Sequence, residues 1–315
     1  MKFKKPKFWD LKKRGIMSYI LLPFTIPIIL NNFLLRKSLK KTRKELVTIC
    51  VGNIYIGGTG KTPTALKLYK ALKNLDCKVA IGKKFYKSQI DEKILLEKKT
   101  SLITFNSRKE IIETAIQNNI GFLVFDDGLQ DRNVSYDVKI VCFDQNWIGN
   151  GNLIPAGPLR EKISSLKKYD IAILKEIDLT ENNAEILIKK INPEIKIFHS
   201  YFEVTNLNNF DLSKNFLFFS GIGNPENFKK TLLKNNFKIV DEIIYPDHHN
   251  YNEKDIIDIK NRAKKIDAKI ITTEKDYVKI SQIDKKEIEF LEVELKIKNE
   301  KSLIDYLKNK NNEKH

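Results

Sequence analysis

The sequence predicts an α/β fold with two lobes, preceded by a hydrophobic segment. Apolar, β-branched stretches alternate with stretches of helical apolar spacing, which is typical of a mostly parallel sheet covered by helices. A glycine-rich turn joins the first strand to the first helix, and polar or ionisable residues follow several later strands. With 315 residues and 42% hydrophobic content, the chain is long enough for two buried cores. We expect an N-terminal segment at 1–45, a first lobe at 46–205 and a smaller α/β lobe at 206–315, with 206–214 as a hinge.

The N-terminal segment contains residues 16–35, which carry no charge and are flanked on both sides by lysines and arginines. Their number meets the roughly 20 residues that a membrane-spanning helix needs, but Pro23 and Pro27 interrupt a simple helix. The basic flanks fit a helix in an anionic membrane interface equally well, and no signal-peptide cleavage site follows. We expect a membrane-associated helix on the cytoplasmic face, with spanning and interfacial positions both open. A buried helix of the globular domain is the alternative.

The net charge and the cysteines limit the classes of partner. A formal charge of +17 fits an anionic membrane surface, a phosphorylated substrate or nucleic acid. The lysines are scattered without interleaved aromatic residues, so we expect no nucleic-acid partner, and compositional bias toward lysine is the alternative source of the charge. Cys50, Cys77 and Cys142 are far apart, and two lie in predicted strands, so we expect reduced, buried packing residues.

A phosphate-binding turn is predicted between the first strand, at 46–51, and a helix at 61–75. Its residues are Tyr55, Ile56, Gly57, Gly58, Thr59, Gly60, Lys61 and Thr62. The glycines allow positive φ angles, so that successive N–H groups point at phosphate oxygens near the helix N-terminus. We expect Lys61 to reach the β- and γ-phosphates of ATP and the Thr62 hydroxyl to bind Mg²⁺. The first lobe is therefore predicted to be a P-loop NTPase-like α/β/α core, although Tyr55 replaces the first glycine of the strict motif.

Ionisable residues at later strand ends complete the predicted site. The strand at 121–125 runs into Asp126 and Asp127, where the magnesium-organising acid of P-loop enzymes lies, and Asp126 is the better candidate. A simple strand-terminating turn is the alternative. A loop rich in glycine and proline ends in Arg160 and Glu161, which we expect to clamp an anionic group and to help hold the metal. Further strands are predicted at 78–81, 101–105, 138–143, 171–174 and 195–198, with a helix at 107–117.

The second lobe is predicted to begin with a strand at 216–219 and a helix from Glu226. Two later motifs, at 245–251 and 270–276, place polar residues at strand ends, where ligands of α/β proteins bind. His248 lies in the first of these motifs, in a turn beside a second histidine, and a histidine there is able to accept a proton near neutral pH. Loop histidines bonded to backbone are the alternative.

In this order, the motifs resemble those of the tetraacyldisaccharide 4′-kinases (lipid A 4′-kinases). The resemblance covers almost the whole chain through Gly-Asn-x-x-x-Gly-Gly-Thr-Gly-Lys-Thr-Pro, Asp-Asp-Gly-Leu-Gln, Leu-x-Pro-Ala-Gly-Pro-Leu-Arg-Glu, Gly-Ile-Gly-Asn-Pro, Pro-Asp-His-His-x-Tyr and Thr-Thr-Glu-Lys-Asp. It implies transfer of the γ-phosphate of ATP to the 4′-hydroxyl of an acylated glucosamine disaccharide 1-phosphate at the inner membrane. It also implies two α/β lobes joined by a hinge, and we expect a monomer.

The resemblance implies roles for two further residues. The Gly-Asp-Glu motif of the family is matched by 90–92, so that Asp91 is the candidate base for the sugar hydroxyl and His248 its partner. The loop before Asp91 is shorter than in the family, and Asp131 stands where the family usually has histidine. The competing hypothesis is a membrane-tethered P-loop switch or ATPase without a sugar acceptor, which would not need Asp91 and His248.

Overall fold

The computed structural model describes residues 6–11, 14–34, 46–75, 77–86, 90–131, 133–144, 147–175, 183–247 and 249–313. The chain divides into two compact units, each assembled from segments that are far apart in sequence. Unit 1 comprises Met1–Phe85, Thr100–Tyr201 and Leu295–His315, and unit 2 comprises Tyr86–Lys99 and Phe202–Glu294. The predicted division was linear, whereas these units exchange two segments of the chain.

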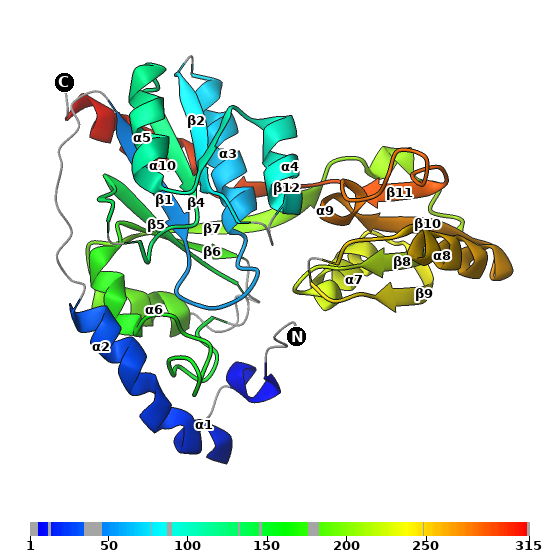
Figure 1. The fold of residues 1–315 in the computed structure, drawn as a ribbon, viewed down its shortest axis with the longest axis horizontal. Helices are drawn as coiled ribbons and strands as arrows, with labels where there is room; N and C mark the ends of the chain where they lie inside the picture. Colours follow the sequence, from blue (N-terminus) through cyan, green and yellow to red (C-terminus); the bar gives the residue numbers. More distant parts are fainter. Residues whose placement is uncertain are drawn as a thin grey trace. The chain divides into compact units, whose positions relative to one another are not determined.

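Unit 1 is built on an eight-stranded sheet with the order β12-β7-β6-β5-β1-β4-β2-β3. The pairs from β3 to β7 run parallel (Figure 1). Every residue of β1 is buried, which explains why this strand reads as a continuous apolar run. The strands are β1 (Val47–Gly52), β2 (Val79–Lys84), β3 (Leu102–Phe105), β4 (Phe122–Asp126), β5 (Val138–Phe143), β6 (Ile171–Lys175), β7 (Lys196–Val204) and β12 (Val293–Ile297).

Helices pack against this sheet and supply its core. The α3 helix contacts β1, β2 and β4, and α5 contacts β2 and β3. The predicted strands and helices of this lobe are confirmed with small shifts at their ends, except that β7 extends well past the predicted 195–198. The helices are α3 (Lys61–Lys73), α5 (Arg108–Gln117), α6 (Asn183–Ile191), α10 (Glu300–Asn312) and the 3₁₀ helix η4 (Ile163–Lys168).

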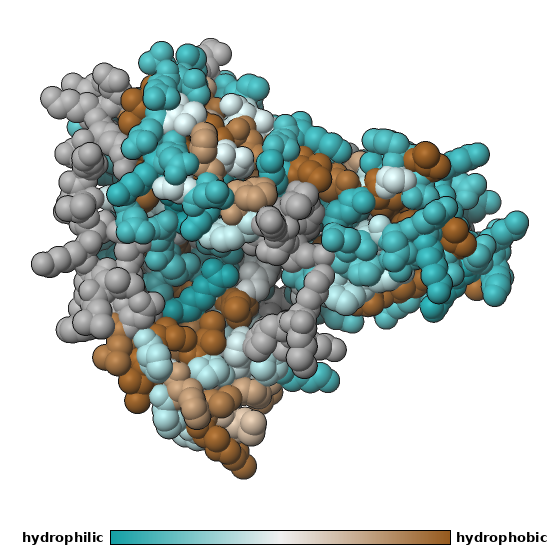
Figure 2. All heavy atoms as spheres, in the orientation of Figure 1, coloured by the Kyte–Doolittle hydropathy of each residue, from teal (hydrophilic) through white to brown (hydrophobic). Residues whose placement is uncertain are grey.

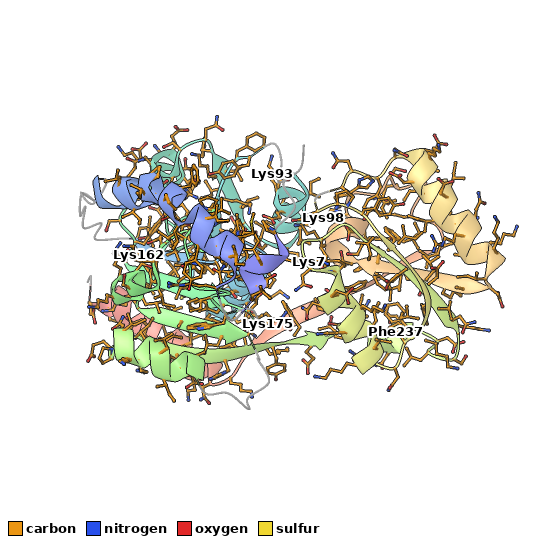
Figure 3. All side chains as sticks on the ribbon, turned by 90° about the horizontal axis from the view of Figure 1, so that it is seen from below. Lys7, Lys93, Lys98, Lys162, Lys175 and Phe237 are labelled. Atoms are coloured by element: carbon orange, nitrogen blue, oxygen red, sulfur yellow. The ribbon has the colours of Figure 1, made fainter. Side chains whose placement is uncertain are left out.

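Unit 2 has a four-stranded sheet with the order β11-β10-β8-β9, and all its strand pairs are parallel. Its core includes Phe210, Phe216 and Phe237, whose ring centroids lie 4.9 to 6.4 Å apart; Phe237 is labelled in Figure 3. The elements are α4 (Ile90–Lys99), η5 (Leu207–Asn209), β8 (Asn215–Ser220), α7 (Pro225–Lys234), β9 (Lys238–Ile244), α8 (Glu253–Lys265), β10 (Ala268–Thr273), α9 (Glu274–Tyr277) and β11 (Ile288–Leu291).

The chain passes between the units at four points, two of them inside strands. It leaves unit 1 within β7, after Tyr201, and returns to it within β12, before Leu295. The predicted linker at 206–214 instead belongs to unit 2, where Leu207 and Leu212 pack against the core. The α4 helix also belongs to unit 2, and Lys275 Nζ lies 3.3 Å from Glu92 Oε1 on it.

The hydrophobic N-terminal segment is helical but broken. It forms η1 (Lys7–Asp10), α1 (Ile16–Leu21), η2 (Leu22–Thr25) and α2 (Ile26–Leu34). Within the described residues, none of the helices combines the length and apolarity needed to cross a membrane. Ile16 is 80% exposed and Phe24 64% exposed, whereas Ser18 and Thr25 are buried. A fully buried helix is therefore wrong, although Ile28 and Ile29 of α2 pack against the core around Tyr55. The membrane helix remains a prediction.

Candidate active site

The glycine-rich turn joins β1 to α3 in the conformation that an anion site requires. Gly57 has φ 141° and Gly60 has φ 84°, both in the region that favours glycine, whereas Gly58 is not among the positive-φ residues. Gly60 is the N-cap of α3, and within the described part of the chain no side chain caps this helix. Since the first N–H groups of a helix have no partner within it, they are available to an anion.

Asn53, a buried residue of the motif for which no role was predicted, holds the turn in shape. Its side-chain amide donates to Gly57 O at 3.2 Å and to Thr59 Oγ1 at 3.0 Å. Lys61 Nζ donates to Asn53 Oδ1 at 3.3 Å. Asn53 thus fixes both the backbone of the turn and the lysine that follows it.

Asp126 lies at the end of β4, directly beside the phosphate-binding turn. Its position follows from the sheet register, in which Val51 of β1 pairs with Asp126. The Thr62 hydroxyl donates to Oδ2 at 3.0 Å and lies 3.2 Å from Oδ1. Lys83 Nζ, from β2, lies 2.6 Å from Oδ2. The structure therefore brings the predicted Thr62 and Asp126 together and adds a lysine that was not predicted.

Asp127 faces two other cations. Lys61 Nζ lies 3.1 Å from Asp127 Oδ2, and Arg160 Nη1 lies 3.6 Å from the same oxygen. Burial by itself would raise the pKa of Asp127, but Lys61 and Arg160 outweigh it and hold that pKa below its usual value. The carboxylate is therefore anionic at neutral pH.

The glycine- and proline-rich loop packs directly on the phosphate-binding turn. Arg160 N donates to Ile54 O at 2.7 Å, and Ile56 N donates to Pro158 O at 2.9 Å. Tyr55, at the position of the missing glycine, is 1% exposed, and its hydroxyl contacts the Asp10 carboxylate. Tyr55 thus serves packing, and the loop carries Arg160 to the site.

Glu161 belongs to a neighbouring hydrogen-bond network. Its Oε1 accepts from Gln130 Nε2 at 3.0 Å and from the Tyr169 hydroxyl at 2.9 Å. The same Gln130 amide donates to Asn53 O at 2.9 Å. Glu161 is therefore connected to the turn through Gln130, and its role as a metal ligand remains a prediction.

The donor set around Thr62 suits Mg²⁺. Among the described residues, no cluster of three or more His, Cys, Asp or Glu side chains would bind a metal. Mg²⁺ needs no such cluster, because it is usually bound by one or two carboxylates together with waters and substrate phosphates. The Thr62 hydroxyl and the Asp126 carboxylate fit this requirement.

Asp131 stabilises the turn that carries the two aspartates. Arg108 Nη1 lies 2.7 Å from Asp131 Oδ2, and Arg108 Nη2 donates to Asp127 O at 3.1 Å. Asp131, in place of the expected histidine, thus anchors an arginine that holds the backbone of Asp127. Sequence reasoning did not identify Arg108, because an arginine in the first turn of a helix is usually exposed.

The structure describes the side chain of neither predicted acceptor residue. His248 is not among the described residues, and for Asp91 the structure gives only its backbone in α4. Asp91 belongs to unit 2 together with the rest of α4. The neighbouring His249 bonds to Asp255 Oδ2 through Nε2 at 2.9 Å and stacks on Tyr245. The roles of Asp91 and His248 therefore stay predictions.

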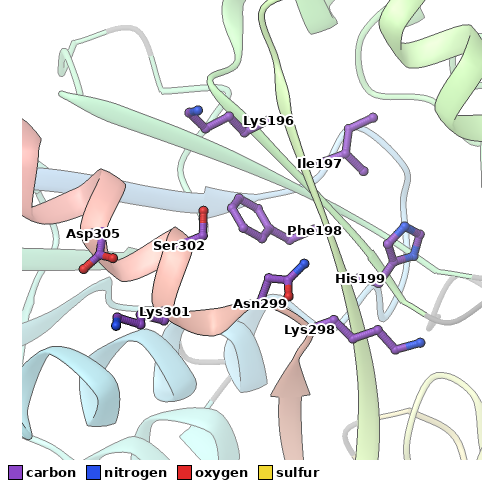
Figure 4. A pocket seen from close by; sticks show the side chains of 9 residues that line it. All are labelled: Lys196, Ile197, Phe198, His199, Lys298, Asn299, Lys301, Ser302 and Asp305. Carbon is purple, nitrogen blue, oxygen red and sulfur yellow. The ribbon is translucent and has the colours of Figure 1, made fainter.

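An open pocket of about 640 Å³ lies between β7 and the start of α10 (Figure 4). Its lining includes Lys196, His199, Lys298 and Lys301 but none of the predicted site residues whose side chains the structure describes. His199 Nε2 already pairs with Glu185 Oε1 at 2.7 Å. This pocket is separate from the phosphate-binding turn.

Comparison with known proteins gives one family along nearly the whole chain. Residues 18–312 match the family model described as tetraacyldisaccharide-1-P 4′-kinase. A tetraacyldisaccharide 4′-kinase of Pelagibacter ubique is 44% identical over 308 residues, 98% of each chain. One of Rickettsia conorii is 34% identical, covering 93% of this chain and 94% of its own. A crystal structure of LpxK from Aquifex aeolicus with ATP has a TM-score of 0.70 at 22% identity, covers 94% of this chain and 99% of its own, and shows the same fold.

Proposed function

This chain belongs to the tetraacyldisaccharide-1-P 4′-kinase family, and we propose that its cluster of Lys61, Thr62, Asp126 and Asp127 is the phosphoryl-transfer site. The enzyme transfers the γ-phosphate of ATP to the 4′-hydroxyl of a tetraacylated glucosamine disaccharide 1-phosphate in lipid A biosynthesis. One observation carries the site assignment: an uncapped helix N-terminus, a lysine and two carboxylates meet at the ends of the adjacent strands β1 and β4.

The site holds ATP by its phosphates. The N–H groups of the turn and of the first turn of α3 bind phosphate oxygens, and the Lys61 ammonium adds a positive charge at their edge. Arg160, which shares Asp127 with Lys61, stabilises charge that develops on the transferred γ-phosphoryl group. Asp127 keeps both cations aligned before the nucleotide binds.

Thr62 and Asp126 are the residues that would hold Mg²⁺. When bound, this ion neutralises phosphate charge as phosphoryl transfer proceeds. Asp127 is the next candidate ligand, because it follows Asp126 directly. Glu161 acts on the same site through Gln130, which joins it to Asn53.

The acceptor hydroxyl needs a base, and we assign this role to Asp91 with His248 as its partner. The assignment is supported by the match of 90–92 and of the Pro-Asp-His-His turn to motifs of the family. A carboxylate paired with a histidine is able to take the hydroxyl proton as the phosphoryl group arrives. Asp91→Ala should lower kcat by about 100-fold or more while the affinity for ATP is unchanged. Glu97→Ala on the same helix is the matched control, and an unchanged kcat in Asp91→Ala would move the base elsewhere.

The N-terminal helices provide a surface suited to a membrane interface. Figure 2 shows hydrophobic side chains gathered over α1 and α2, and Ile16, Phe24 and Leu30 are each more than half exposed. We assign this face, together with the flanking basic residues, to the cytoplasmic side of the inner membrane, where the acylated substrate lies. Vesicle flotation tests this assignment: Phe24→Ser with Ile16→Ser should reduce binding to anionic vesicles. Equal binding of the variant and wild type would contradict it.

Lys61→Ala tests the site itself. Loss of this charge at the phosphates should lower phosphoryl transfer by about 100-fold or more. Lys70→Ala, on the exposed side of the same helix, is the matched control and should keep near-normal turnover. Circular dichroism should show that both variants are folded. Retained turnover in Lys61→Ala would refute the assignment of the turn.

A further inference from the structure

Lys83 is a buried lysine beside the carboxylate that we assign to the metal. It lies near the end of β2, which pairs with β4 in the parallel sheet, and Asp126 ends β4. The Lys83 and Asp126 side chains are 6% and 1% exposed, and Nζ lies 2.6 Å from Oδ2. Charge-assisted hydrogen bonds of this length are among the stronger ones in proteins. A full positive charge is therefore fixed on the Asp126 carboxylate.

The same carboxylate oxygen would be needed by the divalent cation. Oδ2 of Asp126 accepts the hydrogen bond of the Thr62 hydroxyl at 3.0 Å, and these two groups form the proposed Mg²⁺ donor set. Mg²⁺ requires oxygen ligands at about 2.0–2.1 Å in near-octahedral geometry. An ammonium group on the same oxygen blocks one approach and repels the ion.

Lys83 is separate from the lysine of the phosphate-binding turn. Lys61 Nζ bonds to Asp127 Oδ2 and Asn53 Oδ1, whereas Lys83 Nζ bonds to Asp126. Each lysine thus has its own carboxylate. Removing the charge of Lys83 leaves the contacts of Lys61 in place.

We propose that Lys83 competes with the divalent cation for Asp126 and thereby sets the Mg²⁺ concentration that the enzyme requires. This inference rests on the proposed role of Asp126. Without metal, the hydrogen bond from the ammonium keeps the buried carboxylate oriented. When metal binds, Lys83 leaves Oδ2, and the phosphates that arrive with the metal offer it new acceptors.

Direct binding of Mn²⁺, used as a paramagnetic substitute for Mg²⁺, tests the competition without any turnover. The electron paramagnetic resonance signal of free Mn²⁺ is titrated with nucleotide-free wild type, Lys83→Met and Lys83→Gln. Both variants should bind Mn²⁺ about tenfold more tightly or better, because the ion no longer has to displace the positive charge of Lys83 from the Asp126 carboxylate. Lys83→Gln retains a donor opposite Asp126, which keeps the test available if Lys83→Met does not fold.

Two controls separate this inference from the proposed site. Lys84→Met removes the same charge from the next residue of β2 and should leave the affinity for Mn²⁺ unchanged. Lys83→Met with Asp126→Asn should lose the gain, because the released ligand is absent. Mn²⁺ binding that depends on Asp126 but is equal in wild type and both Lys83 variants would overturn the competition alone. Binding that is indifferent to Asp126→Asn would overturn the metal assignment and the competition with it.

Discussion

A double-mutant cycle on Lys83 and Asp126 measures the buried ion pair at the centre of the site. The perturbations are Lys83→Met, Asp126→Asn and the two together. Each single change leaves a charge buried without its partner, since the two side chains are 6% and 1% exposed. Such a loss costs about 3–5 kcal/mol of the free energy of unfolding.

The structure places both single variants toward the lower end of that range. In Lys83→Met, the Asp126 carboxylate still accepts the Thr62 hydrogen bond. In Asp126→Asn, the amide oxygen still accepts from Lys83. We therefore expect a cost of about 3 kcal/mol for each. The double variant buries neither charge, so its cost should be about 3 kcal/mol below the sum of the single costs.

Tryptophan fluorescence during urea unfolding is the appropriate assay. The chain has two tryptophans, and both Trp9 and Trp147 lie in unit 1 together with the ion pair. Their signal therefore follows unfolding of that unit, which matters because a protein of two units need not unfold in one step. Single costs below about 1 kcal/mol, or a double cost equal to the sum of the single costs, would refute the buried pair.

Three further outcomes are expected. Burial alone would raise the pKa of Asp127, but Lys61 and Arg160 outweigh burial and lower it. The unfolding free energy of wild type should therefore exceed that of Asp127→Asn by an amount that is constant above about pH 5 and shrinks as the pH falls below the usual pKa of 3.8. A difference that grows in acid would contradict this prediction. Burial raises the pKa of Cys142 to about 12, so a disulfide reagent at pH 8 should modify the half-buried Cys77 quickly and Cys142 only after unfolding; rapid native modification of Cys142 would show that β5 is accessible. Trp9 is 1% exposed and its Nε1 donates to Pro155 O at 3.0 Å. Trp9→Ala should therefore lower the free energy of unfolding, measured by circular dichroism, by about 3 kcal/mol. A negligible change would mean that η1 does not hold the glycine- and proline-rich loop.

The phosphate-binding turn was predictable because its signals are local. An apolar run, glycines at positions that need positive φ and a following helical pattern all lie within about twenty residues, as the sequence shows for 46–66. Asp126 was predictable because parallel strands end at the same edge of a sheet, so a carboxylate after an apolar strand falls beside the turn.

Lys83 and the unit boundaries were not predictable because they depend on contacts distant in sequence. A lysine at a strand end is usually exposed, and Lys83 is buried only because β4 inserts between β1 and β2. The C-terminal α10 joins unit 1 because β12 pairs with β7. The N-terminal helices expose apolar side chains such as Ile16 and Phe24, whereas a surface helix of a globular protein usually turns its apolar side chains toward the core. Apolar spacing alone therefore could not predict which side of these helices faces solvent.

Phosphoryl transfer at the Lys61 turn should be coupled to the lipid acceptor. The most direct measurement, made in the presence of magnesium, follows the transfer of labelled γ-phosphate from ATP to a tetraacylated disaccharide 1-phosphate in detergent micelles. Total ATP consumption is recorded in parallel. We expect one labelled phosphate at the 4′ position for each ATP consumed, with consumption ending when the lipid is exhausted. ATP hydrolysis at the same rate without lipid, and no labelled lipid, would contradict it and indicate a membrane-tethered ATPase.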